Sequence, residues 1–128
     1  MARLMRVLVI DDEKPLADTL VLILRYAGYD ATAAYDGAAA LSQIESFLPD
    51  VIICDVIMPG ANGIETCRRI LAQHPTCRII LFSGQAATNG LIRDARNQGC
   101  SWELLAKPVD PEELLAKLAA LKSDLEPR

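Results

Sequence analysis

Five polar side chains of this sequence follow apolar runs and are of types that can bind a metal or take part in catalysis. They are three carboxylates, one hydroxyl and one primary amine, from Asp11, Asp12, Asp55, Ser83 and Lys107. Carboxylates held close together repel one another strongly, so a cluster of them needs a cation. A hard divalent ion such as Mg²⁺ suits this role, because it takes a few oxygen ligands and keeps several waters. Carboxylates with Mg²⁺, an amine and a hydroxyl are typical of a site that handles phosphoryl groups.

Asp55 is the best candidate in this group for a nucleophile that takes up a phosphoryl group. It stands alone at the end of its apolar run, whereas Asp11 and Asp12 are adjacent and remain available for a metal. The amine of Lys107 would neutralise phosphoryl oxygens, and the hydroxyl of Ser83 would donate a hydrogen bond to one of them. We therefore predict catalytic roles for Asp55, Ser83 and Lys107.

Taken one at a time, these residues have plainer interpretations. Asp11 and Asp12 are also suited to a solvated turn or a helix cap, and Ser83 alone is more often a turn residue. Lys107 after an apolar strand could be an edge lysine whose stem covers apolar surface. The functional interpretation depends on their occurring together, at the ends of successive strands.

The apolar runs lack alternation, which is typical of strands buried on both faces of a parallel sheet. Strands are predicted over 6–10, 29–34, 51–54, 77–82 and 102–106. Helices are predicted after them, over 16–27, 38–47, 64–73, 89–98 and 110–121. This alternation predicts an α/β protein with helices on both faces of a parallel sheet. The polar side chains should then converge at the edge formed by the carboxyl ends of the strands.

The composition of the 128 residues, of which 52% are hydrophobic and 23% charged, is that of a globular protein. This length suits a single domain over 1–128, with a core of about 5–122 and a frayed tail from Ser123 to Arg128. No apolar run approaches the roughly 20 residues of a membrane span, so no membrane association is expected. The net charge of −4 argues against non-specific nucleic acid binding.

Four cysteines, at Cys54, Cys67, Cys77 and Cys100, show no metal-binding spacing and no nearby histidine cluster. We interpret them as reduced, mostly buried small hydrophobic residues of a cytoplasmic protein.

The order of these motifs resembles the response-regulator receiver domain of bacterial two-component signalling, of the CheY-like superfamily. The resemblance covers essentially the whole chain. It rests on Asp11-Asp12, on the nonapeptide Asp-Val-Ile-Met-Pro-Gly-Ala-Asn-Gly at 55–63, on Ser83-Gly84 and on Lys107-Pro108. Each motif alone is weak, but all four in order at successive strand ends are specific.

This resemblance implies a flavodoxin-like (βα)5 fold with strand order 2-1-3-4-5. It implies that Asp55 accepts phosphate from a histidine kinase or histidine phosphotransfer protein. Mg²⁺ would be held directly by Asp12, Asp55 and the main-chain carbonyl of Ile57, and by Asp11 mainly through water. The Lys107–Pro108 bond is expected to be cis.

The resemblance further implies a switch rather than an enzyme, with self-phosphorylation and self-dephosphorylation as its only reactions. The surface formed by the predicted elements 89–98, 102–106 and 110–121 would change on phosphorylation. It would control a downstream protein or output domain, and it is also a candidate surface for a homodimer. Direct contact with nucleic acid is not expected of this domain.

Two departures from the family pattern affect the expected switch. Receivers usually carry Tyr or Phe three residues before the active-site lysine, where this chain has Leu104, and the nearest aromatic residue is Trp102. The switch, expected to involve Ser83, could use Trp102, use no aromatic residue, or be weakened. Ile57 and Gln85 occupy the positions that tune the lifetime of the phosphate, and the branched side chain of Ile57 should exclude water and lengthen that lifetime.

Two other functional classes remain open at this point. One is a protein-interaction module that works without phosphorylation, which Leu104 favours slightly. The other is a phosphatase with an aspartate nucleophile, which usually has a second aspartate two residues after the first; Ile57 cannot serve as that general acid.

Overall fold

The computed structural model describes residues 3–58, 61–84 and 102–125, and four positions between the last two ranges (90, 93, 96 and 97). Its main sheet contains β1 (Arg6–Ile10), β2 (Asp30–Ala34), β3 (Val51–Asp55), β6 (Arg78–Ser83) and β7 (Glu103–Ala106). Its described helices are α1 (Lys14–Tyr26), α2 (Gly37–Phe47), α3 (Gly63–Gln73) and α5 (Pro111–Leu125). These elements alternate along the chain as the apolar runs predict.

All neighbouring strands of the five-stranded sheet are parallel, in the order β2-β1-β3-β6-β7. Numbered along the chain, these five strands have the order 2-1-3-4-5, so the predicted topology is confirmed. β3 is central and buried at every position, which explains its continuous apolar sequence. The parallel arrangement brings the carboxyl ends of all five strands to one edge.

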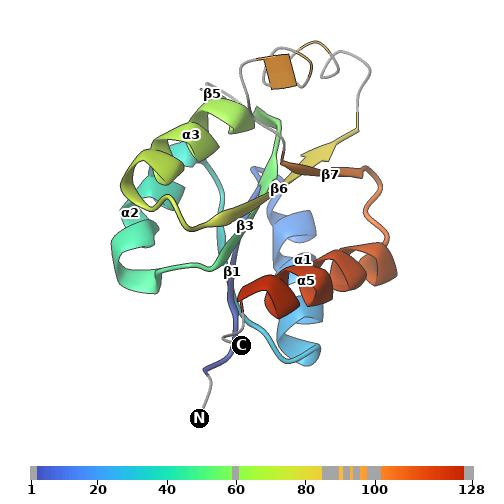
Figure 1. Cartoon of the computed structure of the whole chain (residues 1–128). Helices are drawn as coiled ribbons and strands as arrows, with labels where there is room; N and C mark the ends of the chain where they lie inside the picture. The colour runs from blue at the N-terminus through green and yellow to red at the C-terminus, as the bar shows by residue number, and fades with distance from the viewer. Residues whose placement is uncertain are drawn as a thin grey trace.

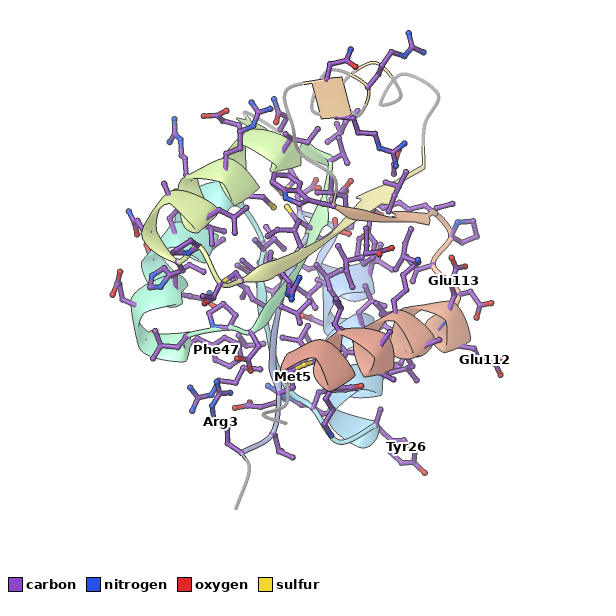
Figure 2. All side chains as sticks on the ribbon, in the orientation of Figure 1. Arg3, Met5, Tyr26, Phe47, Glu112 and Glu113 are labelled. Carbon is purple, nitrogen blue, oxygen red and sulfur yellow. The ribbon has the colours of Figure 1, made fainter. Side chains whose placement is uncertain are left out.

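Helices cover both faces of the sheet, with α2 and α3 on one face and α1 and α5 on the other (Figure 1). Each face has its own apolar cluster, one around Ile52 and Ile70 and the other around Phe82 and Leu118. Side chains fill the space between the sheet and both helical layers (Figure 2). Tyr26, at the end of α1, projects into solvent instead. Two buried layers therefore hold the strands in register from both sides.

Short polar residues fix where several helices begin. Asp36 accepts a hydrogen bond from Ala39 N at the start of α2, and Asn62 accepts one from Glu65 N at the start of α3. Asp110 accepts a bond from Glu112 N before α5, as its sequence predicts. Gly28 follows α1 with φ of +100°, a conformation that favours glycine.

The loop after β3 differs from the simple turn that its sequence suggests. Ile57–Met58 (β4) and Ala61–Asn62 (β5) form a two-stranded antiparallel pair, and Pro59 and Gly60 between them lie outside the described residues. This pairing of two-residue strands is too short to produce an apolar pattern in the sequence.

The C-terminal tail also differs from its prediction. Helix α5 continues to Leu125, so residues 123–125 belong to a helix rather than to a frayed tail. Pro127 is the first residue in this stretch that cannot continue a helix. The helix predicted over 89–98 lies mostly outside the described residues, and its four described positions are helical.

Cys54, Cys67 and Cys77 are buried and form no disulfide within the described residues, in agreement with the predicted burial of these three. Cys100 lies outside the described part of the chain. None of the helices within the described ranges is long and apolar enough to cross a membrane.

Candidate functional site

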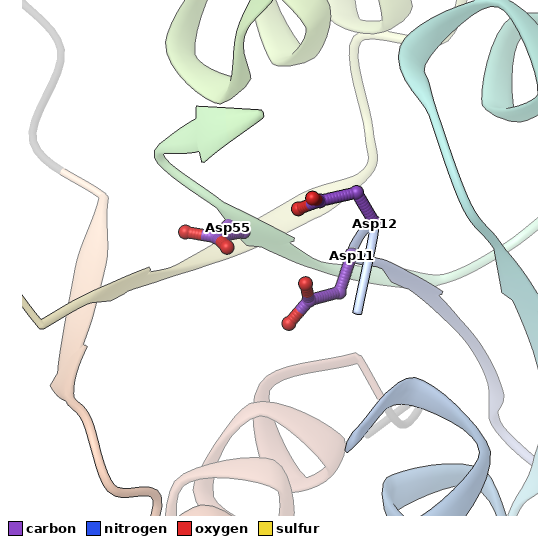
Figure 3. Close-up of side chains that lie close together, drawn as sticks. All are labelled: Asp11, Asp12 and Asp55. Atoms are coloured by element: carbon purple, nitrogen blue, oxygen red, sulfur yellow. The ribbon is translucent and has the colours of Figure 1, made fainter. Parts of the chain in front are cut away.

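Three carboxylates meet at the carboxyl edge of the sheet. β1 and β3 are neighbours with Ile10 opposite Cys54, so the residues that follow on each strand come together. The carboxylates of Asp11, Asp12 and Asp55 each offer an oxygen within 4.8 Å of the others. Figure 3 shows them projecting into a shared space from the ends of two strands. The predicted convergence of these side chains is confirmed, whereas their chemical roles remain predictions.

Asp11 is fully buried and incompletely hydrogen-bonded. Its Oδ1 accepts a hydrogen bond from Glu13 N at 3.0 Å. Its Oδ2 has no hydrogen-bond partner among the described residues. Burial raises the pKa of the Asp11 carboxyl above its usual value, although the Glu13 N–H and the charge of Lys107 act to lower it. A buried carboxylate with an unpaired oxygen is stabilised when a cation binds beside it.

Lys107 is the cation that contacts these carboxylates among the described residues. Its Nζ lies 2.8 Å from Asp55 Oδ2 and 3.7 Å from Asp11 Oδ2. The second contact is an ion pair too long to be a hydrogen bond, which is why Asp11 Oδ2 remains unsatisfied. Burial alone would lower the pKa of Lys107, but the hydrogen bond to Asp55 and the surrounding carboxylates together raise it. The amine is therefore held charged beside Asp55.

The backbone around Lys107 positions this amine. Lys107 N donates a hydrogen bond to Ser83 O at 3.1 Å, which extends the β6–β7 ladder to the site. The Lys107–Pro108 bond is cis, as the resemblance implies. Gly84 lies close to the stem of Lys107, and a Cβ at Gly84 would stand 2.8 Å from Lys107 Cβ. Glycine at 84 thus allows the lysine to reach across the end of β6.

Asp55 is the last residue of β3 and is buried, with 7% of its surface exposed. Its Oδ1 accepts a hydrogen bond from Ile57 N at 3.3 Å, and its Oδ2 faces Lys107. Behind it, α3 begins so close that a Cβ on Gly63 would clash with the main-chain oxygen of Asp55. The glycine at 63 is therefore required by the close approach of α3 to the main chain of Asp55.

The remaining predicted residues are distributed around this centre. Ser83 ends β6 beside Asp55, since Phe82 pairs with Asp55 in the sheet. Ile57 lies next to Asp55 with 41% of its surface exposed. Trp102 and Leu104 are half-buried against the apolar cluster beneath α2 and α3. Gln85 lies outside the described residues.

Glu13 is a member of the site that sequence reasoning missed. Its Oε1 lies 3.7 Å from Lys107 Nζ, although its side chain is 64% exposed. Its position directly after Asp11-Asp12 was the only available signal, and a charged residue before a helix is usually interpreted as a solvated cap.

The donor set fits a hard divalent cation such as Mg²⁺. Asp11, Asp12 and Asp55 supply only oxygen ligands, and the buried Oδ2 of Asp11 lacks a hydrogen-bond donor among the described residues. Carboxylate oxygens are the ligands that Mg²⁺ prefers. One amine among several carboxylates leaves a local excess of negative charge that such an ion would neutralise.

Comparison with known proteins agrees with this architecture. Residues 7–119 match the response regulator receiver domain family. The DNA-binding response regulator MtrA of Mycolicibacterium paratuberculosis is 32% identical over 115 residues, which cover 90% of this chain and 50% of that protein. The chain thus spans about half the length of the curated relatives it matches.

Solved structures give the same result. The signal receiver domain of an HD domain-containing protein from Pseudomonas fluorescens has a TM-score of 0.86 and 29% identity, covering 95% of this chain and 97% of that one. A CheY-like response regulator receiver domain protein from Methanospirillum hungatei has a TM-score of 0.84 and 25% identity, covering 95% and 96%.

A five-stranded parallel sheet with acidic side chains and a lysine at its carboxyl edge defines a CheY-like signalling fold. The chain belongs to the response regulator receiver domain family. This family is generally not one of catalytic enzymes, and its members generally bind Mg²⁺.

Proposed function

We propose that Asp55 of this domain accepts a phosphoryl group from a phosphohistidine on a histidine kinase or a histidine phosphotransfer protein. The observation that carries this proposal is the 2.8 Å contact between Lys107 Nζ and Asp55 Oδ2 beside two further carboxylates. A nucleophile, a fixed positive charge and candidate metal ligands are then present at one edge of one sheet.

In the proposed transfer, a carboxylate oxygen of Asp55 attacks phosphorus while the bond from phosphorus to the imidazole nitrogen breaks. The imidazole leaves with the bonding electron pair. Lys107 exchanges its contact with Asp55 Oδ2 for one with a phosphoryl oxygen, so that the incoming negative charge is met by a preformed cation. The Ser83 hydroxyl would donate a hydrogen bond to another phosphoryl oxygen.

Asp12, Asp55 and the main-chain carbonyl of Ile57 would hold Mg²⁺ directly, and Asp11 would hold it mainly through water. When bound, the ion supplies positive charge that neutralises phosphoryl oxygens. Water held by the ion would give the otherwise unsatisfied Oδ2 of Asp11 a partner, and the charge of the ion would offset the repulsion among the carboxylates.

Incubation with acetyl phosphate and Mg²⁺, followed by intact mass measurement, tests this proposal directly. We expect wild type to gain one phosphoryl group and Asp55→Asn to gain none. Asp50→Asn, which changes an aspartate at the opposite edge of the sheet, is the matched control and should still be phosphorylated. An unmodified wild type would instead favour the phosphorylation-independent interaction module. Continuous turnover of excess substrate would favour a phosphatase.

Ile57 and Gln85 are proposed to tune the lifetime of the phosphate. Because the exposed aliphatic side chain of Ile57 is adjacent to Asp55, it should keep attacking water away from the phosphoryl group. Ile57→Asn is expected to speed dephosphorylation several-fold, since an amide can hold a water. The decay of the phosphorylated mass after removal of the donor measures this rate, and an unchanged rate would contradict the assignment.

The switch is proposed to involve Ser83, Trp102 and Leu104, with changes carried to β7 and α5. Trp102 and Leu104 are half-buried against the apolar cluster beneath α2 and α3, so their packing there would change when the site changes. Phosphorylation would shift the population between two conformations, because the phosphoryl group interacts better with one of them.

We propose that the chain is one receiver domain over 1–128 that works in the cytoplasm. Its partners would be a phosphohistidine donor and a downstream protein or output domain, with dimerisation through the β7–α5 side as an alternative. DNA binding is stated for the MtrA relatives, of which this chain covers only about half, and it is not proposed for this domain.

A further inference from the structure

Glu13 is placed by its backbone in a way that leaves its side chain available. It is the residue before α1, yet its side chain makes no capping hydrogen bond within the described structure. Its N–H donates to Asp11 Oδ1, and its carbonyl accepts from Ala17 N at 3.0 Å. The main chain is therefore held on both sides, while the carboxylate reaches to 3.7 Å from Lys107 Nζ.

Glu13 shares the charge of Lys107 with two other carboxylates. Lys107 already contacts Asp55 at 2.8 Å and Asp11 at 3.7 Å, so Glu13 is the third carboxylate around one amine. The adjacent Lys14 directs its Nζ over the Tyr35 ring, 5.0 Å from the ring centroid. With 64% of its side chain exposed, Glu13 is the outermost of the carboxylates around Lys107.

We propose that Glu13 is a selectivity residue that disfavours small phosphodonors of high negative charge. This inference rests on the proposed phosphorylation of Asp55. Because the Glu13 carboxylate is exposed and lies 3.7 Å from Lys107 Nζ, it repels a donor that brings anionic oxygens to Lys107, and this repulsion grows with the charge of the donor. The domain would thereby be protected from phosphorylation by small anionic metabolites in the absence of its protein donor.

Acetyl phosphate and phosphoramidate separate charge from other effects. Acetyl phosphate is a dianion near neutral pH: Asp55 oxygen bonds to phosphorus, the bond to the acetyl oxygen breaks, and acetate leaves with the electron pair. Phosphoramidate carries a protonated nitrogen and a net charge of −1. With it the P–N bond breaks and ammonia leaves with the electron pair, so neither reaction needs a further reactant.

The test compares Glu13→Gln with wild type, using both donors at saturating Mg²⁺ and measuring rates of phosphorylation by intact mass. Glutamine keeps the shape of the side chain and removes only its charge. We expect the rate with acetyl phosphate to rise about threefold to tenfold and the rate with phosphoramidate to rise clearly less. The difference should largely disappear at 1 M salt, where the Debye length is about 3 Å.

Glu45→Gln is the matched control, because Glu45 is an exposed glutamate that contacts His74 on another part of the surface. Its ratio of rates with the two donors should equal that of wild type. An equal rise with both donors in Glu13→Gln, or no change, would overturn the selectivity role while leaving Asp55 as the phosphoacceptor. Absence of phosphorylation in all proteins with both donors would overturn the proposed function and this inference together.

Discussion

A half-buried aspartate at one edge of the sheet and a fully buried aspartate at the other differ in how completely their carboxylates are hydrogen-bonded. Asp50, before β3 at the amino edge, receives two hydrogen bonds of 2.8 Å from the Arg3 guanidinium and one of 2.8 Å from Arg6 N. Asp11, after β1 at the carboxyl edge, is fully buried and has an oxygen with no hydrogen bond from any described residue.

The pKa values of the two carboxyl groups reflect this difference. Burial acts to raise the pKa of Asp50, but the hydrogen bonds and charges of Arg3 and Arg6 outweigh it and lower that pKa. Burial dominates at Asp11 and raises its pKa. The structural carboxylate of Asp50 is thus satisfied within the chain, whereas Asp11, the proposed metal ligand, keeps an oxygen available for a ligand.

The largest expected effect is on the free energy of unfolding, when a glycine at either edge of the sheet is replaced by alanine. Gly63→Ala should lower the free energy of unfolding by about 3 kcal/mol, because its Cβ would collide with the main chain of Asp55 and α3 would have to move. Gly28→Ala should cost only about 1 kcal/mol, since space around Gly28 is open and only its φ of +100° is unfavourable. Urea denaturation measures both, and equal losses would contradict this distinction.

Asp11→Asn should weaken Mg²⁺ binding by about tenfold to a hundredfold, because it removes a charge from the proposed ligand set. Without Mg²⁺ the same variant should be more stable than wild type, since an unsatisfied buried charge is removed. Titration with Mg²⁺ and thermal unfolding in chelator give the two results. A variant that loses stability in chelator would show that Asp11 is structural after all.

Asp50→Asn should lower the free energy of unfolding by about 2 kcal/mol, as expected for loss of hydrogen bonds between charged groups. Its Mg²⁺ affinity should equal that of wild type, because Asp50 lies at the other edge, where Arg3 is labelled in Figure 2. Arg3→Gln provides a second route to the same loss. A changed Mg²⁺ affinity in Asp50→Asn would break the separation between the edges.

The smallest effect is a dependence on pH. Because the pKa of folded Asp50 lies below its unfolded value of about 3.9, its contribution is complete above that value and is lost as pH falls through the folded pKa. The stability difference between wild type and Asp50→Asn should therefore shrink below about pH 4. Urea denaturation from pH 6 to pH 2 measures it, and a constant difference would refute the linkage.

Much of this molecule was predictable because the signals are local. Apolar runs without alternation predicted the five strands of a parallel sheet, and the residue after each run predicted what that strand places at the carboxyl edge. Asp110 with Pro111 predicted the start of α5, and its hydrogen bond to Glu112 N confirms it. The β4–β5 pair was missed because two-residue strands leave no pattern.

The sequence by itself determined which polar residue follows each strand, and therefore which functional groups gather at the carboxyl edge of the sheet. Only the tertiary structure decided which charges are satisfied: Asp50 by Arg3 across 47 residues, and Asp55 by Lys107 across 52. It also decided that Asp11 Oδ2 remains without a hydrogen bond within the described ranges and that Glu13 reaches Lys107. The physical reason is that strand and helix patterns depend on neighbours in the chain, whereas pairing depends on distances of a few ångströms that folding alone creates.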